Sequence, residues 1–441
     1  MKKLVIGVIG LGYIGQPTVA ALANVGYRVV GMDIDSEKIR QLKKGCATLY
    51  EPGLSETLQR TRHLTHFTSD YQELMEECDA ILITIGTPIG ANNAPDTSAL
   101  DTVITHISKF LCQSQTVILR STVVPGTTVE IAGRLEELTG MRCGSDFYVS
   151  YCPERTIEGL ALYELYNLPK IIGGINPEST ERTAEILQRL GGKVVKVSSP
   201  TVAELCKLAD NMYRTLNIAF ANEFGNICEA AKEDAYEVVN AVNTTYNRTS
   251  IFRPGLGASG PCLSKDPVIL SYFAGRQGVS TPIVNACVSG NIAATMRPAQ
   301  ETLSFIQQHG LEQPHLAMLG LSFKGSPETD DSRGAPSQDI YHALRENGIG
   351  VVDEKSFSFF DPLVRQFEGQ KSATSIEECI QGAHVVLFLT DHAMLRNIPM
   401  EHILRLAARP LLIIDAWHNV VNVGNVQLPE DVRFVQIGAG R

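Results

Sequence analysis

The feature that most constrains the fold is a regular alternation over about the first 200 residues. Short, almost wholly apolar runs alternate there with segments that carry apolar residues at helical spacing. The apolar runs are KLVIGVIG, YRVVGMD, AILITIG, QTVILRS, DFYVSY and KIIGG. Strands that are apolar on both faces are typical of a parallel sheet covered by helices on both sides. The alternation therefore predicts a doubly wound, Rossmann-like α/β domain over residues 1–198.

The pattern changes at residue 199. The segment SPTVAELCKLADNMYRTLNIAFANEFGNICEAAKED has Pro only at its start and repeats apolar residues at helical spacing, which predicts one long helix capped by Ser199 or Thr201. Shorter helical segments follow, so we expect an all-helical domain over residues 199–300. Strand–helix alternation resumes with HLAMLGLSF, SFSFFDP, AHVVLFLT, LLIIDAW and VRFVQIG. This predicts a second Rossmann-like domain over residues 314–441, in a chain of the α/β class.

Composition excludes several kinds of partner. The formal net charge of −10 gives no basic surface for nucleic acid. Ten cysteines contain no CxxC pair and no His/Cys spacing, so we expect reduced thiols and no metal site. No apolar stretch reaches the ~18 residues that a membrane span needs. Glycines interrupt the apolar run at the N-terminus, which argues against a signal peptide, and we expect a cytoplasmic protein.

A glycine motif follows the first predicted strand. Gly10, Gly12 and Gly15 form G-x-G-x-x-G at the start of a helix, and Asp33 ends the second predicted strand. The glycines let the backbone approach a pyrophosphate, while an acidic side chain at the second strand binds ribose hydroxyls and repels a 2′-phosphate. The motif therefore predicts NAD as the cofactor. Lys38 could lie near the adenosine or be a solvated helix charge.

Polar residues follow three further predicted strands. Thr87 lies in Gly86-Thr87-Pro88, Thr122 in Ser121-Thr122, and Glu154 and Glu158 in CPERTIEG. The carboxyl ends of parallel strands meet at the edge where ligands bind in open α/β sheets. We expect these side chains at that edge, where paired carboxylates suit proton transfer or water activation. A turn, a helix cap or a surface ion pair is the alternative for each.

The sequence GLGASGPCLSKD carries a candidate nucleophile, Cys262. Glycines and Pro261 predict a loop that lies close to a ligand, and the nearby Lys265 would favour the thiolate. Lys207 and Asn211 are four residues apart on the predicted long helix, so they project from one face. A Lys and an Asn on a core-forming face are costly to bury without a role. An exposed face is the alternative.

Six segments together resemble the UDP-glucose/GDP-mannose dehydrogenase family. They are GLGYIG, STVVPGT, CPERTIEG, ELCKLADNMYRTLNIAFANE, GASGPCLSKD and LGLSFKGSPETDDSRGAP, in this order along nearly the whole chain. The resemblance implies an N-terminal NAD-binding domain, a central helical domain that forms a homodimer, and a C-terminal domain that binds the nucleotide diphosphate of a UDP-sugar.

The resemblance also implies a mechanism. Cys262 would attack the C6 aldehyde formed by a first hydride transfer, and a second transfer would leave a thioester that water hydrolyses. Lys207 and Asn211 would stabilise negative charge on the C6 oxygen, and Asp266 would partner Lys207 or the catalytic water. Glu158 would handle the proton or the water, with Glu154 and Thr122 near the nicotinamide and the reacting carbon.

The remaining site residues are carried over from the same motifs. Expected cofactor contacts are Tyr13, Ile14, Thr87 and Lys265, together with the glycines, Asp33 and Lys38. Expected substrate contacts, besides those above, are Arg155, Arg253, Gly260, Lys324 and Arg333, with Arg248 as an alternative to Arg253.

The choice of sugar rests on conflicting motifs. Glu158 is typical of members that act on UDP-glucose, whereas PER, GPC and FKG-x-PETDD look like the N-acetylhexosamine branch. Ser264 replaces the family's usual Pro, and Asp415-Ala-Trp-His-Asn replaces a D-x-R-N motif. UDP-N-acetyl-D-mannosamine is the first expectation and UDP-glucose the alternative. A two-electron β-hydroxyacid dehydrogenase and a non-catalytic nucleotide-sugar sensor are further alternatives.

Overall fold

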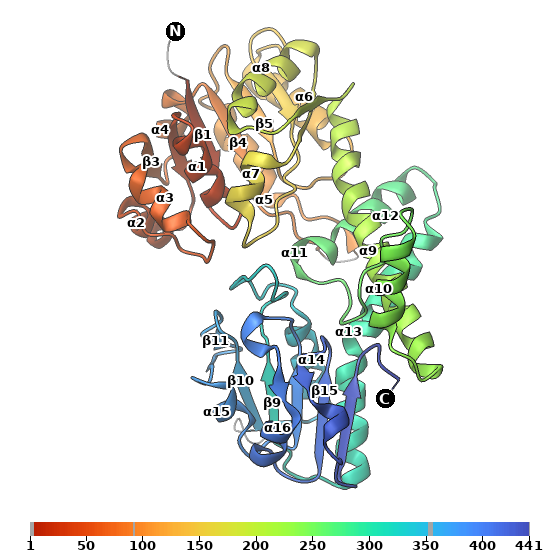
Figure 1. Ribbon diagram of the computed structural model, residues 1–441. Coiled ribbons are helices and arrows are strands. Elements are labelled where there is room, and N and C mark those ends of the chain that lie inside the picture. Colours follow the sequence, from red (N-terminus) through yellow and green to blue (C-terminus); the bar gives the residue numbers. More distant parts are fainter. Residues whose placement is uncertain (1–3, 91–92, 352–355, 441) are drawn as a thin grey trace. The chain divides into compact units, whose positions relative to one another are not determined.

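The computed structural model describes residues 4–90, 93–351 and 356–440. The chain divides into two compact units, Met1–Asp210 with Val268–Ser280 and Asn211–Pro267 with Thr281–Arg441. Each unit contains one main sheet of mostly parallel strands, and helices fill the middle of the sequence (Figure 1). The predicted α/β class, with two nucleotide-binding-type sheets and a helical central region, is confirmed. None of the helices in the described ranges is both long and apolar enough to cross a bilayer.

The first unit holds an eight-stranded sheet in the order β3-β2-β1-β4-β5-β6-β7-β8. The strands are β1 Val5–Ile9, β2 Arg28–Met32, β3 Thr65–Thr68, β4 Ala80–Ile83, β5 Thr116–Leu119, β6 Tyr148–Tyr151, β7 Lys170–Gly174 and β8 Val194–Lys196. Neighbours are parallel except β6 and β7. The order of β1 to β6 is that of dinucleotide-binding sheets. The sequence patterns missed β3 and β8, because these edge strands are only partly buried.

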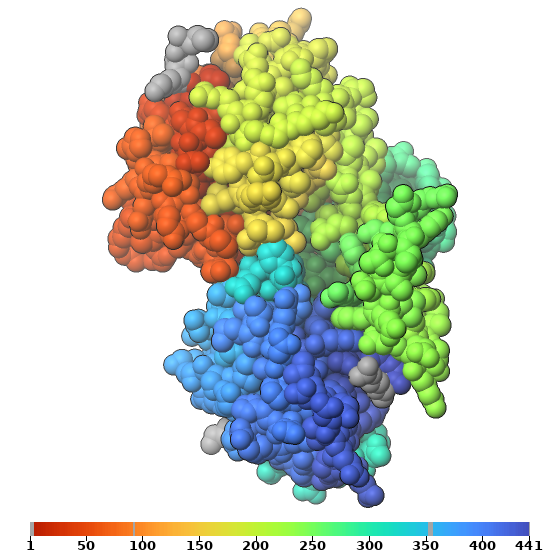
Figure 2. Space-filling view, in the orientation of Figure 1, coloured from red at the N-terminus to blue at the C-terminus, as the bar shows by residue number. Residues whose placement is uncertain are grey.

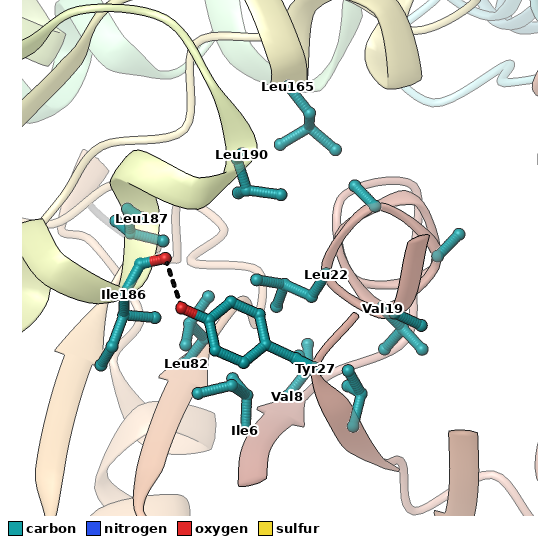
Figure 3. Packing of buried hydrophobic residues seen from close by; sticks show 14 of the residues in the cluster. Ile6, Val8, Val19, Leu22, Tyr27, Leu82, Leu165, Ile186, Leu187 and Leu190 are labelled. Atoms are coloured by element: carbon teal, nitrogen blue, oxygen red, sulfur yellow. Dashed lines mark hydrogen bonds between the residues drawn. The ribbon is translucent and has the colours of Figure 1, made fainter. Parts of the chain in front are cut away.

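Helices cover this sheet. They are α1 Gly15–Asn24, α2 Ser36–Lys43, α3 Leu54–Arg60, α4 Tyr71–Glu77, α5 Ser98–Ser108, α6 Thr127–Thr139, α7 Ala161–Asn167 and α8 Pro177–Leu187. Figure 3 shows Tyr27 among aliphatic side chains of the core between sheet and helices, with its hydroxyl donating to the carbonyl oxygen of Ile186 at 3.1 Å. This bond joins residues 159 apart in sequence, so the β7–α8 region closes the same core as β1 and α1.

The predicted long helix is α9, Pro200–Ala230, with 31 residues. Ser199 begins it, because its Oγ accepts a hydrogen bond from the N–H of Val202 at 3.3 Å, whereas Thr201 lies inside the helix. The other central helices are α10 Ala235–Thr245, α11 Gly260–Leu263, α12 Asp266–Arg276 and α13 Pro282–His309. α13 continues past residue 300, where the sequence predicted the helical domain to end.

The second unit holds a five-stranded parallel sheet in the order β10-β9-β13-β15-β17. Its strands are β9 Leu316–Leu319, β10 Phe357–Phe360, β13 Val385–Phe388, β15 Leu411–Asp415 and β17 Val432–Gln436. Its helices are α14 Pro336–Glu346, α15 Ile376–Ile380 and α16 Met400–Leu406, and two-residue strands form the pairs β11 Gln366–Phe367 with β12 Gln370–Lys371 and β14 Ile398–Pro399 with β16 Val420–Val421. The strand order reverses between β9 and β13, the point where doubly wound sheets bind ligands.

Candidate functional site

The glycine loop after β1 has the geometry of a pyrophosphate site. A Cβ on Gly15 would lie 1.9 Å from the carbonyl oxygen of Gly10, so only glycine lets α1 start so close to β1. A Cβ on Gly12 would meet nothing within 4 Å, so this residue faces open space. No side chain caps the N-terminus of α1, where the partly exposed Tyr13 and Ile14 precede the first turn. Free backbone N–H groups at a helix start bind phosphate, so this loop fits a dinucleotide.

Asp33 lies beside the loop. Its Oδ2 accepts hydrogen bonds from the N–H of Leu11 at 2.8 Å and from Lys38 Nζ at 2.9 Å, and its Oδ1 accepts the N–H of Asp35. The carboxylate therefore stands where the ribose of a dinucleotide would bind. Lys38 points at Asp33, so its charge is not a freely solvated one, and a contact with adenosine stays a prediction.

Side chains at the carboxyl ends of β1, β4 and β5 hold these strands' loops together. Thr84 Oγ1 donates to the carbonyl oxygen of Gly10 at 2.7 Å, and Thr87 Oγ1 donates to that of Thr122 at 2.5 Å. The structure thus brings Thr87 and Thr122 together, as their shared position at strand ends predicted. Both lie on the same edge of the sheet as the glycine loop.

Glu154 follows β6 and is buried. Its Oε1 accepts the N–H groups of Arg155 and Thr156, each at 2.8 Å, and its Oε2 lies 2.5 Å from Nη2 of Arg120. Burial raises the pKa of a carboxyl, but Arg120 and the hydrogen bonds outweigh it, so the pKa of Glu154 lies below its usual value. Sequence reasoning missed Arg120. Its signal was a charged residue directly after the apolar run QTVIL.

The rest of the loop after β6 is held from several sides. Arg155 Nη1 pairs with Asp210 at 3.0 Å, and the buried Glu51, a second residue that sequence reasoning missed, accepts the N–H of Gly159 at 2.7 Å. Glu158 between them is partly exposed. Lys207, on α9, is buried, with 7% of its surface exposed. A buried cation of this kind favours an anionic ligand.

Cys262 lies in the short helix α11 of the second unit, and its residue is exposed. Asp266 is fully buried four residues later. Its Oδ2 accepts a hydrogen bond from Asn211 Nδ2 at 2.5 Å, and its Oδ1 accepts one from Lys265 Nζ at 2.8 Å. Three predicted catalytic or cofactor residues therefore form one chain, Asn211–Asp266–Lys265. Within this unit the partners of Asp266 are Asn211 and Lys265.

The cysteine loop adjoins the motifs around β9. The N–H of Gly260 donates to the carbonyl oxygen of Gly334 at 2.9 Å, and a Cβ on Gly260 would lie 2.6 Å from the ring of Phe323. Gly260 has a φ of +82°, so glycine is favoured here for both reasons. Phe323 and Gly334 are the chain neighbours of Lys324 and Arg333, whose contacts with the substrate stay a prediction.

The positively charged side chains predicted to contact the substrate differ in their partners and in their exposure. Lys324 Nζ donates to the carbonyl oxygen of Pro327 at 2.6 Å, and Arg333 pairs with Asp331 at 2.6 Å while most of its side chain stays exposed. Arg253 is exposed and its guanidinium carbon lies 5.3 Å from the centre of the Tyr236 ring. The alternative, Arg248, lies over Tyr246.

The loop after β9 repeats the loop after β1. The sequence IGLGYIG at residues 9–15 matches LGLSFKG at 319–325, and Gly10 and Gly320 have φ values of +90° and +89°. Asp361, which directly follows β10, takes the place of Asp33 and accepts the N–H of Leu321 at 2.7 Å. However, Asp361 is only 1% exposed, and its carboxylate accepts hydrogen bonds from backbone N–H groups of the loops after β9 and β10. Sequence reasoning did not identify Asp361.

Comparison with known proteins gives three consecutive matches to the UDP-glucose/GDP-mannose dehydrogenase family. The NAD-binding domain of that family matches residues 4–191, its central domain residues 201–292 and its UDP-binding domain residues 317–422. The site of Asp33 falls in the first of these domains, and Lys324 and Arg333 fall in the third.

Similar proteins cover nearly the whole chain. UDP-N-acetyl-D-mannosamine dehydrogenase of Methanococcus maripaludis is 33% identical over 90% of this chain and 88% of its own, and that of Pyrococcus horikoshii is 33% identical over 99% of both. The solved structure of UDP-D-ManNAc dehydrogenase from P. horikoshii aligns with a TM-score of 0.87 and 30% identity, over 99% of this chain and all of that one. The chain therefore belongs to the UDP-glucose/GDP-mannose dehydrogenase family and is an NAD-dependent nucleotide-sugar dehydrogenase.

Proposed function

We propose that this enzyme oxidises the C6 hydroxymethyl group of UDP-N-acetyl-D-mannosamine to a carboxylate, in two steps and through a thioester on Cys262. The observation that carries the covalent part is the exposed Cys262 close in sequence to a fully buried carboxylate, Asp266, which is bonded to Asn211 and Lys265. The relatives that act on UDP-N-acetyl-D-mannosamine support the sugar.

The first step converts the alcohol at C6 to an aldehyde. Gly10, Gly12, Gly15 and Asp33 would hold NAD, which would accept one hydride in each step, so that two NAD are reduced for each sugar. The hydroxyl proton leaves as the carbon is oxidised, so negative charge develops on the C6 oxygen. The ammonium of Lys207, a buried residue, suits the stabilisation of that charge.

The second step uses Cys262. Its thiolate adds to the aldehyde carbon, which forms a C–S bond and leaves a second anionic oxygen. One N–H of Asn211 is fixed by Asp266, which holds the amide in one orientation for this oxygen. Loss of a second hydride equivalent gives the thioester. Water then adds to the carbonyl carbon and the C–S bond breaks, which yields the carboxylate, a proton and the free thiol.

A carboxylate is needed to orient the hydrolytic water and to accept its proton. We propose Glu154 for this role, with Glu158 as the alternative that the family resemblance suggested. Glu154 is fixed by three hydrogen bonds and stays ionised, whereas Glu158 is partly exposed. Glu154→Gln should slow hydrolysis and let the thioester accumulate, which intact-protein mass spectrometry detects as a stable adduct on Cys262. Accumulation only in Glu158→Gln would assign the role to Glu158.

The decisive experiment counts NADH per molecule of UDP-N-acetyl-D-mannosamine consumed. We expect two NADH for the wild type and no net acid formation in Cys262→Ala. Cys112→Ala is a matched control, because Cys112 is also exposed but lies outside the proposed site. One NADH per sugar would support the two-electron β-hydroxyacid alternative, and uronic acid formed by Cys262→Ala would refute the covalent mechanism.

The sugar is tested separately. A panel of UDP-N-acetylmannosamine, UDP-N-acetylglucosamine, UDP-N-acetylgalactosamine and UDP-glucose should give the highest kcat/KM with the first. A higher kcat/KM for UDP-glucose would identify UDP-glucose as the substrate, the alternative that Glu158 suggested, and would not affect the proposed covalent mechanism.

We further propose a homodimer through the central helices. α9 exposes a row of large apolar side chains along its second half, Tyr213, Leu216, Phe220 and Ile227, and α13 exposes Ile283 and Ile292. Figure 2 shows the green segment that contains α10 at the surface. Exposed apolar patches of this kind mark protein–protein contacts. Light scattering should give twice the chain mass of 48.0 kDa, and Phe220→Glu should shift it toward the monomer. A monomeric wild type would refute the proposal.

A further inference from the structure

Arg120 is a buried charge that the mechanism above does not use. It directly follows β5, is 6% exposed, and its Nη2 lies 2.5 Å from Glu154 Oε2. Its Nε and Nη1 atoms are also buried and have no hydrogen-bond partner among the residues that the structure describes. A guanidinium has five N–H donors, and burying it with so few acceptors is unfavourable. Packing alone therefore does not explain an arginine at this position.

The partner of Arg120 lies at the ligand edge of the first sheet. β5 and β6 are parallel neighbours, and Arg120 and Glu154 follow their carboxyl ends. The same edge carries Thr87 and Thr122, which are joined by a hydrogen bond. Arg120 thus contacts Glu154, which belongs to the proposed site, whereas Arg120 itself has no role in the mechanism proposed above.

The side chains of the other ionisable residues around Glu154 either bind other groups or stay neutral. Lys170 Nζ donates to three backbone carbonyl oxygens, those of Leu165, Leu168 and Gly191, and burial lowers its pKa. Arg155 pairs with Asp210 through its guanidinium and binds Glu154 only through its backbone N–H. Cys152 is fully buried, which raises the pKa of its thiol to about 11, so it stays neutral. Arg120 is therefore the cation paired with the Glu154 carboxylate among the described residues.

We propose that Arg120 is a positioning residue that keeps Glu154 ionised and in one orientation at the ligand edge. This inference rests on the proposed role of Glu154 in activating water. A carboxyl buried to this extent favours its neutral form unless an opposite charge stands next to it. A protonated Glu154 cannot accept a proton from water, so the pairing sets the lowest pH at which the hydrolytic step works.

The proposal predicts a specific change in pH dependence. Without Arg120, burial becomes the dominant influence and the pKa of Glu154 rises. An adjacent opposite charge typically lowers a carboxyl pKa by about 1–3 units, so the acid limb of the kcat profile in Arg120→Met should move up by about that much. Arg120→Lys keeps a positive charge on a shorter side chain, so its acid limb should lie close to that of the wild type. A merely structural role would lower kcat at all pH values without moving the limb.

The test combines kinetics with a spectroscopic readout. The pH profile of NADH formation is measured for the wild type, Arg120→Met, Arg120→Lys and the double variant Arg120→Met/Glu154→Gln. Difference infrared spectra of the same full-length proteins report a protonated carboxyl at neutral pH. We expect that band in Arg120→Met, and not in the wild type or the double variant. An unmoved acid limb together with no such band in a folded Arg120→Met would overturn the proposal.

Two further outcomes are informative. If Arg120→Met does not fold, recovery of the native circular dichroism spectrum in the double variant supports the proposal, because the damage then comes from an unpaired Glu154. Failure of the double variant to fold overturns it. If the wild type makes no uronic acid, the proposed function fails, while the infrared spectra still decide whether Arg120 holds Glu154 ionised.

Discussion

Asp361→Asn is the substitution whose effect follows most directly from the structure. Asp361 Oδ2 accepts the N–H groups of Leu321 and Ser322, and Oδ1 accepts those of Leu363 and Val364. Asparagine keeps one acceptor oxygen, and its NH2 group must face one of these two pairs of donors. Two buried N–H groups then lose their acceptor at about 1–3 kcal/mol each, so the free energy of unfolding should fall by about 2–6 kcal/mol.

The chain contains a convenient probe for this effect. Trp417 is its single tryptophan and lies just after β15 in the same unit as Asp361, with Nε1 donating to the carbonyl oxygen of Leu389 at 2.9 Å. Urea unfolding followed by its fluorescence therefore reports on the second unit. For a loss of about 4 kcal/mol and a slope of about 2 kcal/mol per molar urea, the midpoint should fall by about 2 M.

Asp33→Asn is the matched control. It changes the equivalent carboxylate of the first sheet, so it should weaken NAD binding while leaving the Trp417 transition close to that of the wild type. If the urea midpoint of Asp361→Asn lies within about 0.3 M of that of the wild type, with an unchanged dependence of the unfolding free energy on urea, the reasoning is wrong. The hydrogen bonds of this carboxylate would then not stabilise the loop after β9.

Two more predictions can be checked directly. Gly15→Ala should abolish NAD binding measured by calorimetry, because the added Cβ would lie 1.9 Å from the carbonyl oxygen of Gly10; binding within tenfold of the wild type would contradict the loop geometry. In the folded protein at pH 8, a thiol reagent should label the exposed Cys46, Cys112 and Cys262. Cys152 should stay unlabelled until denaturant is added, because burial holds the pKa of its thiol at about 11; rapid labelling of Cys152 would refute its burial.

The sequence predicts the fold well where the pattern is local. The apolar runs that became β1 and β9 are continuous over a whole strand, and the helical spacing of residues 200–230 has no interruption. β8 was missed because an edge strand buries only part of its residues, which weakens the apolar pattern.

The site was predictable only in part. The glycine loop and Asp33 share a spacing that can be read from the sequence, and the structure brings them together. Arg120 meets Glu154 across 34 residues and Glu51 meets Gly159 across 108, and no periodicity marks such a partner. A charged residue at a strand end also reads as an ordinary surface residue until its burial is known, which is why Arg120 was not singled out.

The repeated loops after β1 and β9 bear on how the enzyme sorts two similar ligands. NAD and a UDP-sugar both carry a ribose and a diphosphate, and both sheets offer a glycine turn to such a group. The two carboxylates differ in exposure. Asp33, beside the first loop, is 9% exposed and is accessible to a ribose, whereas Asp361, beside the second loop, is 1% exposed. We therefore expect that the second loop does not bind NAD, and that titration with NAD saturates at one equivalent per chain.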